Sequence, residues 1–125
     1  HQMRNLPTAN NVRQEIQDKK QREVFDKLVE LVNANLTDQQ FSVDHLCLEL
    51  GMNRTKLYSF IKSTTGMSLG NYIRKIRLDK AAELLRTTDM SISEVGYAVG
   101  IESPSYFTRT FKEQFGSSPS EFIKH

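Results

Sequence analysis

A repeated pattern of capped helices constrains the fold of this chain more than any other feature of its sequence. The segment Ser42–Gly51 recurs as Ser91–Gly100, about 50 residues later, with serine first, glycine last and apolar residues at matching places between them. The segment Leu57–Ile73 recurs in the same way as Phe107–Ile123. The copies differ in spacing by one residue after Gly100, in a turn, where insertions are tolerated best. The chain is therefore predicted to contain two copies of one supersecondary unit.

Each copy is predicted to consist of a short helix, a turn that contains glycine, and a second helix. Ser42 and Ser91 are suitable N-caps because a serine hydroxyl accepts a hydrogen bond from the first turn of a helix. Gly51 and Gly100 are expected to end the short helices because glycine adopts the left-handed conformation at no steric cost. The two copies are expected to span about residues 42–66 and 91–116.

A long connecting helix is predicted over residues 69–86, with Ser68 as its N-cap. Its apolar residues cover more than one face, which is expected of a helix that packs against a bundle on each side. Further helices are expected from Arg22 to Leu36 and from Pro119 onward. Because no segment alternates with period two, the fold class is predicted to be all-α, with about seven helices in two homeodomain-like bundles.

A short helix, a turn and a second helix form the helix-turn-helix arrangement, in which the second helix enters the major groove of DNA. The connecting helix would be about 27 Å long at ~1.5 Å per residue, close to the ~34 Å of one turn of B-DNA. This length suits a monomer that reads two successive major grooves. The alternative at this point is a pair of plain helical hairpins with no ligand.

The positive charge of the chain is unevenly distributed, although its formal net charge is only +2. The segment from Arg54 to Lys80 holds seven cations and only one anion, Asp79. Such an excess attracts phosphate, but it is also compatible with an ordinary solvated helix face. The seven cations are Arg54, Lys56, Lys62, Arg74, Lys75, Arg77 and Lys80.

Other features set the context of the predicted domain. Residues 1–21 are mostly polar and are interpreted as a linker from an upstream domain, helical from about Asn11, so the folded domain is expected to be residues 22–125. No apolar run reaches the ~20 residues of a membrane helix, and no signal-peptide pattern opens the chain. A single cysteine agrees with a reducing compartment, and a cytoplasmic location is expected for this domain.

Several motifs together resemble the AraC/XylS family of bacterial transcription regulators over roughly residues 24–124. The family's long aromatic-arginine block is followed by a Gly-x-Ser-Pro turn. Ile101 departs from the phenylalanine usual in the family, and Phe122-Ile123-Lys124 departs from its common aromatic-arginine ending. The matching motifs are Tyr72-Ile73-Arg74, Arg77-Leu78, Ala81, Leu84-Leu85, Ser105-Tyr106-Phe107-Thr108-Arg109-Thr110-Phe111-Lys112 and Gly116-Ser117-Ser118-Pro119.

This resemblance implies sequence-specific binding of double-stranded DNA for transcription regulation. The stretches Leu50–Tyr58 and Ser103–Phe107 are also similar to the C-terminal output domains of hybrid two-component sensors of gut Bacteroidetes. A hybrid sensor would be anchored in the inner membrane in its full-length form. The resemblance further implies two partners: RNA polymerase and an upstream regulatory domain of the same chain. It also implies that the full-length protein forms a dimer.

The second helix of the first copy is expected to turn Leu57 and Ile61 inward. By resemblance to the family, base contacts fall on Thr55, Tyr58 and Ser59. Hydroxyl groups discriminate weakly between bases, so this helix is expected mainly to position the domain. Arg54, Lys56 and Lys62 suit phosphate contacts.

The equivalent helix of the second copy is expected to turn Phe107 and Phe111 inward. Arg109 is the strongest candidate for base reading because an arginine can bond bidentately to guanine O6 and N7. Its alternatives are a phosphate contact or an intramolecular salt bridge. The remaining exposed positions are divided between base contacts at Ser105 and Tyr106 and phosphate contacts at Thr108 and Lys112.

No enzyme is predicted, because no catalytic constellation stands out, and no cofactor or metal is expected. Cys47 lies on a buried stripe, and His1, His45 and His125 show no metal-ligand spacing. Arg77 is expected to pair with an acid such as Asp79 or Glu83 and so to hold the connecting helix. The alternative function is a helical protein-interaction module that docks on RNA polymerase or a signalling domain.

Overall fold

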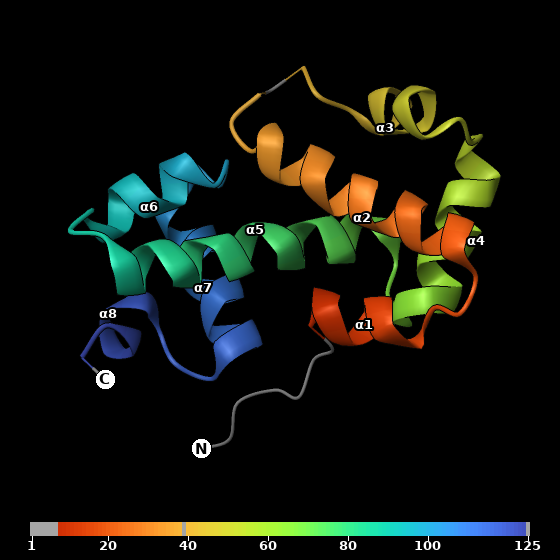
Figure 1. Cartoon of the computed structure of the whole chain (residues 1–125). Helices are drawn as coiled ribbons and strands as arrows, with labels where there is room; N and C mark the ends of the chain where they lie inside the picture. The colour runs from red at the N-terminus through yellow and green to blue at the C-terminus, as the bar shows by residue number, and fades with distance from the viewer. Residues whose placement is uncertain (1–7, 39, 125) are drawn as a thin grey trace. The chain divides into compact units, whose positions relative to one another are not determined.

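The computed structural model describes residues 8–38 and 40–124, and this part of the chain is built from eight helices without a strand (Figure 1). The all-α prediction is therefore confirmed. The eighth helix, beyond the seven or so expected, is α1. The helices are α1 (Ala9–Glu15), α2 (Lys19–Ala34), α3 (Val43–Leu50), α4 (Arg54–Thr65), α5 (Leu69–Thr87), α6 (Ile92–Ala98), α7 (Pro104–Phe115) and α8 (Pro119–Phe122).

The helices form two compact units that meet within the sequence of α5. The N-terminal unit holds α1 to α4 and the part of α5 up to Ile76. The C-terminal unit holds the rest of α5, from Arg77, together with α6 to α8. Each unit thus contains one copy of the repeat, as the sequence predicted.

The core of the N-terminal unit forms where α2, α3, α4 and α5 turn their apolar faces together. The rings of Phe25 on α2 and Tyr72 on α5 lie 5.9 Å apart, and both residues are buried. At the end of α3, Lys27 Nζ donates a hydrogen bond of 2.9 Å to the carbonyl of Glu49. The main buried residues are Phe25, Leu28, Val32, Leu46, Leu57, Ile61, Leu69, Tyr72 and Ile76.

The interpretation of residues 1–21 as a linker is wrong for the part that the structure describes. Thr8 caps α1, and Val12 and Ile16 are only 3% and 6% exposed within the core cluster. Arg13 on α1 forms an ion pair of 2.8 Å with Asp26 on α2. These residues fold with the domain because α2 offers them an apolar surface, while residues 1–7 lie outside the described part.

The helix predicted from Arg22 begins earlier, at Lys19, with Asp18 as its N-cap. The side chain of Asp18 accepts a hydrogen bond of 3.1 Å from the backbone N–H of Gln21. The first turn of α2 is polar, so the spacing of apolar residues along the helix does not reveal this turn. The capping aspartate was the available signal.

The core of the C-terminal unit is aromatic, as its three phenylalanines at helical spacing indicate. Phe107 and Phe111 on α7 are buried, and Phe111 contacts Phe115 and Phe122 with ring centroids 4.6 Å and 5.2 Å apart. Val95 on α6 is fully buried. Phe107 and Phe111 are core residues, as predicted, and the half-buried Phe115 and Phe122 pack against Phe111.

Polar contacts hold the second part of α5 within the C-terminal unit. Arg77 Nη1 donates to the carbonyl of Val99 at 2.9 Å, so this contact ties α5 to the end of α6 through a backbone carbonyl and not through the acid that the sequence suggested. Burial lowers the pKa of the Arg77 guanidinium below its usual value. Gln114 Nε2 donates to Asp79 Oδ1 at 2.7 Å, which joins α7 to α5.

The predicted caps account for most of the helix ends. Ser91 with Glu94 and Ser118 with Glu121 form the two expected capping boxes. Gly51 adopts φ 66° at the end of α3, as expected of a left-handed C-cap. α6 ends at Ala98, two residues before Gly100, which also has a positive φ of 81°.

Candidate nucleic-acid interface

Helix α4 presents a polar face that matches the one predicted from the sequence. Asn53 caps the helix by accepting a hydrogen bond from the N–H of Lys56, and Leu57 and Ile61 are fully buried. All six candidate DNA contacts of this helix are exposed. They are Arg54, Thr55, Lys56, Tyr58, Ser59 and Lys62.

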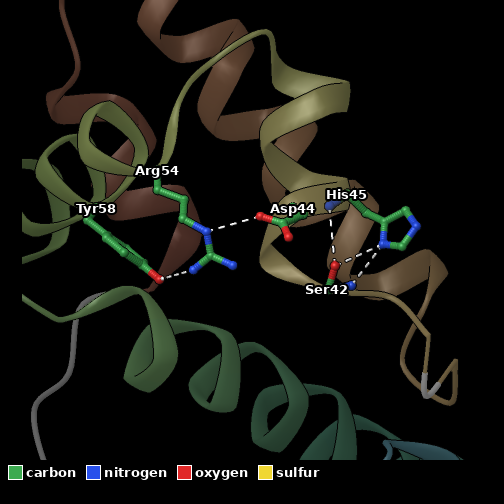
Figure 2. A network of polar contacts seen from close by, with 5 residues as sticks. All are labelled: Ser42, Asp44, His45, Arg54 and Tyr58. Carbon is green, nitrogen blue, oxygen red and sulfur yellow. Dashed lines mark hydrogen bonds and ion pairs between the residues drawn. The ribbon is translucent and has the colours of Figure 1, made fainter.

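Arg54 is held by two neighbours at the surface of the N-terminal unit (Figure 2). Its Nε lies 3.0 Å from Asp44 Oδ1 on α3, and its Nη1 donates to the hydroxyl of Tyr58 at 3.2 Å. The Asp44 carboxylate, mainly through its hydrogen bond, raises the pKa of Arg54 above its usual value. The contact therefore ties the start of α3 to α4 and orients the Tyr58 hydroxyl.

The start of α3 is fixed by a capping box that the sequence did not predict. The N–H of Ser42 donates to His45 Nδ1 at 3.2 Å, in the place where Glu or Gln usually accepts (Figure 2). His45 is thereby engaged in local structure. The signal was present, because His45 stands at the third helical position after a capping serine.

Helix α7 repeats the arrangement of α4 in the C-terminal unit. Ser103 caps it, Pro104 occupies its first turn, and Phe107 and Phe111 face the core. All five candidate contacts of this helix are exposed. They are Ser105, Tyr106, Thr108, Arg109 and Lys112.

Arg109 lies over the ring of Tyr106, with its guanidinium carbon 5.3 Å from the ring centroid. This is a cation–π contact between residues that are neighbours on one helix face. Among the described residues, no carboxylate forms an ion pair with Arg109. Its sequence-based alternative, an intramolecular salt bridge, therefore has no counterpart in this part of the structure.

Lys62 and Lys112 occupy equivalent places near the ends of α4 and α7. Lys62 Nζ donates to the carbonyl of Gly66 at 3.1 Å, so its ammonium lies near the last turn of α4. A cation there also interacts favourably with the carbonyl end of the helix. Both lysines are exposed, and an ammonium has three donors, so a phosphate can share Lys62 with Gly66.

Only part of the predicted basic cluster is available at the surface. Lys75 is 4% exposed and cannot form part of an outward-facing patch. Lys80 Nζ lies 2.7 Å from Glu83 Oε2, and Arg54 is paired with Asp44. Counting the cations in the sequence overstates the positive charge that this segment offers to DNA, because two of the cations are paired with carboxylates and one is buried. The sequence does not show these pairings or this burial, since both depend on the fold.

Thr108 has different surroundings from the other candidates. It lines a recess of about 210 Å³ between α6 and α7, together with Tyr97, Glu102 and apolar groups. A phosphate at Thr108 would have the Glu102 carboxylate as a neighbour. Thr108 is therefore the weakest of the five candidates on α7.

The described residues offer little support for other kinds of site. Within this part of the chain, no group of three or more His, Cys, Asp or Glu side chains gathers as a metal site would require. None of the described helices has the length and apolar character to cross a membrane. Cys47 is half-buried against the core of the N-terminal unit, and His1 and His125 lie outside the described residues.

Comparison with known sequences places these features in a family. A family model described as a helix-turn-helix domain matches residues 46–125. The chain is 37% identical over 100 residues to histidine kinase P4 of Formosa agariphila. The aligned segment covers 80% of this chain and 7% of that protein. The chain spans about a third or less of the length of the first curated relatives that it matches.

Solved structures with the same fold agree with this assignment. A regulator with an AraC-type DNA-binding domain from Chromobacterium violaceum matches with a TM-score of 0.77 and 27% identity, over 86% of this chain and 95% of that one. The DNA-binding domain of AdpA, solved with a target DNA, matches with a TM-score of 0.69 and 28% identity, over 86% and 92%. The chain belongs to the helix-turn-helix family of AraC-type DNA-binding domains found in bacterial transcription regulators.

Proposed function

We propose that this domain binds double-stranded DNA sequence-specifically by inserting α4 and α7 into two successive major grooves. The observation that carries the proposal is the same division of faces on both helices. Each buries its apolar residues in its own unit and exposes every polar residue that the sequence assigns to DNA. The likeness to the AdpA domain, whose structure contains a target DNA, supports it.

The two helices have different parts in the proposed complex. On α7, Arg109 reads guanine, Ser105 and Tyr106 contact bases, and Thr108 and Lys112 contact phosphates. On α4, Thr55, Tyr58 and Ser59 contact bases, while Arg54, Lys56 and Lys62 contact phosphates. Because Arg54 is shared with Asp44, Lys56 and Lys62 supply most of the anchoring on this side.

The connecting helix α5 supports reading of two grooves by one monomer. It has 19 residues, or a length of about 28 Å at ~1.5 Å per residue. Helix-turn-helix readers of successive grooves stand ~34 Å apart.

The experiment that tests DNA binding is a titration of labelled duplex with this chain at several salt concentrations. Phosphate contacts release counterions, so log K is expected to fall steeply and linearly with log salt, with a slope of about −0.9 per contact. Duplexes enriched from a random pool are expected to bind more tightly than random ones. Weak, salt-insensitive binding to every duplex would contradict the proposal.

The wider role of the protein is part of the same proposal. The likeness to histidine kinase P4 supports a place as the output domain of a hybrid two-component regulator, with a regulatory domain upstream. In that setting the domain acts in the cytoplasm, without enzymatic activity or a cofactor of its own. RNA polymerase and a second copy of the full-length protein are the expected partners.

A protein-interaction role is the second candidate, and one observation favours it. Leu48 on α3 and Tyr97 on α6 are 79% and 64% exposed, and they occupy equivalent places in the two copies of the repeat. Large apolar groups exposed in this way are typical of contact surfaces. Replacing both by serine should leave DNA affinity unchanged and weaken only binding to RNA polymerase or to a signalling domain.

A further inference from the structure

The contact between Tyr106 and Arg109 arranges a reading surface on α7 before any ligand is bound. The ring centroid and the guanidinium carbon lie 5.3 Å apart, and both side chains are exposed. Stacking on an aromatic face restricts the rotamers of a long arginine side chain. Less side-chain freedom is then lost when the guanidinium meets a base, which favours binding.

Arg54 on α4 is an arginine of the N-terminal unit in a different repeat position, opposite Pro104, and it is arranged differently. Its Nε donates to Asp44, and its Nη1 donates to the Tyr58 hydroxyl. Two of its donating groups are thus occupied, whereas no hydrogen bond or ion pair from Arg109 joins it to another described residue. The donor edge of Arg109 is left for an outside acceptor, and guanine O6 with N7 is the acceptor pair that fits it bidentately.

With the guanidinium of Arg109 on a guanine edge, the ring of Tyr106 would fall beside a neighbouring base pair. A guanidinium bonded bidentately to guanine lies close to the plane of that base. The distance of 5.3 Å between the guanidinium carbon and the centre of the Tyr106 ring equals between one and two base-pair steps of ~3.4 Å. In the major groove, the apolar group that a neighbouring base pair offers at that level is the methyl group of thymine.

We propose that Tyr106 and Arg109 act as one unit that reads a guanine and the thymine of an adjacent base pair. Arg109 recognises the guanine edge, and the Tyr106 ring packs against the thymine methyl while it holds the guanidinium in place. The inference rests on the proposed function of α7 as a reader of the major groove. It adds the base step that α7 selects and makes the aromatic ring, not the hydroxyl, the determinant at Tyr106.

The test begins with duplexes selected from a randomised pool by this chain. In the enriched sequence, the thymine next to the guanine is replaced by uracil, which removes only the methyl group. The variants are Tyr106→Phe, which keeps the ring, and Tyr106→Ala, which removes it. Tyr97→Ala is the matched control, because Tyr97 is an exposed tyrosine on α6, and circular dichroism verifies the folding of each variant.

The expected result is a coupling between the ring and the methyl group. Uracil should weaken binding of the unchanged protein, of Tyr106→Phe and of Tyr97→Ala by about fourfold, the value of one buried methyl-sized group. It should have no effect on Tyr106→Ala. Arg109→Ala should lower the preference for guanine over other bases by at least about fivefold. Tyr106→Ala should also reduce this preference.

Other outcomes overturn the inference in distinguishable ways. If enriched duplexes bind tightly but lack a guanine–thymine neighbour, or if uracil weakens Tyr106→Ala as much as the unchanged protein, the paired reading is wrong and DNA binding stands. If Tyr106→Phe behaves like Tyr106→Ala, the hydroxyl is the determinant and the ring is not. If no duplex is enriched, the proposed function fails, and this inference fails with it.

Discussion

Arg54 shows how an ion pair within the fold limits what one side chain can offer to DNA. The sequence assigns Arg54 to phosphate, and the residue is exposed, yet the Asp44 carboxylate lies 3.0 Å from its Nε. A phosphate that approaches Arg54 therefore also meets a negative charge. Asp44 was not among the sequence candidates, because its meaning depends on the packing of α3 against α4.

Replacement of Asp44 by asparagine tests this limit. Asp44→Asn removes the competing negative charge, so affinity for specific and random duplexes should rise together, and the salt slope should steepen by up to about one contact. Fluorescence anisotropy on both kinds of duplex measures this. Lys80, paired with Glu83, offers a control in Glu83→Gln. A loss of affinity in Asp44→Asn would mean that Asp44 serves to position Arg54 for binding.

The two capping glutamates make the stability of the C-terminal unit depend on pH. Hydrogen bonds from the backbone N–H groups of Ser91 and Ser118 lower the pKa values of Glu94 and Glu121 below their usual value. A lowered pKa in the folded state means that the stabilisation is present above the pKa of the unfolded chain, about 4.3. It is lost as the pH falls through the lower, folded-state value.

The midpoint of thermal unfolding should therefore fall on acidification below about pH 5. In a variant with both Glu94→Gln and Glu121→Gln, an uncharged oxygen still accepts the capping hydrogen bond, so this midpoint should change less with pH. Circular dichroism melts between pH 7 and pH 3 provide the measurement. Identical pH profiles for the two proteins would exclude the capping glutamates as the source.

At the scale of elements, α6 and α7 pack closely at Gly96. A Cβ on Gly96 would lie 3.0 Å from the carbonyl oxygen of Ile101 and 3.3 Å from the Phe107 ring. That carbonyl belongs to backbone in the turn between the helices, where the N–H of Ile101 donates to the carbonyl of Gly96 at 2.8 Å. The approach of the two helices thus requires a residue without a side chain.

Gly96→Ala should destabilise the protein by about 1–2 kcal/mol, because the overpacking cost exceeds the gain in helix propensity. Gly70→Ala is the matched control: Gly70 is also helical, and a Cβ there meets nothing within 4 Å. It should be neutral or stabilising by about 0.5 kcal/mol. Urea denaturation of both variants gives the comparison. An unchanged free energy of unfolding in Gly96→Ala would show that the turn between α6 and α7 moves to make room for the methyl group.

Helix ends were predictable from sequence where a cap residue marks them; the burial of the first helix, expected only as a helical part of a linker, was not. Ser42, Ser91 and Ser118 bond to backbone groups a few residues away, so local sequence is sufficient to identify them. α1 has few apolar residues, and its burial depends on α2. The same reasoning explains Lys75, whose burial no local pattern indicates.

For the candidate site, the sequence identified the exposed faces of α4 and α7 but not the contacts between their side chains. The apolar period of each helix places Leu57 and Phe107 inward and so defines the opposite face. The Asp44–Arg54 pair joins two helices, so it is a property of packing. The Tyr106–Arg109 contact lies within one helix, and their spacing of three residues was an available signal.

At the scale of the whole molecule, the domain begins before the family motifs do. The match to the family model starts at residue 46, whereas the N-terminal core includes Val12 and Ile16. A segment that enters the core contributes to stability and cannot act only as a tether. The described residues from Thr8 onward therefore belong to the folded unit.

Ile16→Ala should lower the free energy of unfolding by about 2 kcal/mol, because it removes a buried side chain of the core cluster. Gln14→Ala, at an exposed position of α1, should change it by less than about 0.5 kcal/mol. Urea denaturation measures both. Equal and negligible effects would restore the interpretation of this segment as a linker.

Reading of two major grooves by one chain can be measured by a footprint on an enriched duplex. Methylation interference at guanine N7 and hydroxyl-radical cleavage would map the contacts of this chain at base-pair resolution. Two protected segments are expected, with centres about 10 base pairs apart on one face of the duplex. Arg109→Ala should remove the interference at a guanine in one segment only. A single protected segment, unchanged by that substitution, would mean that the chain does not read two grooves.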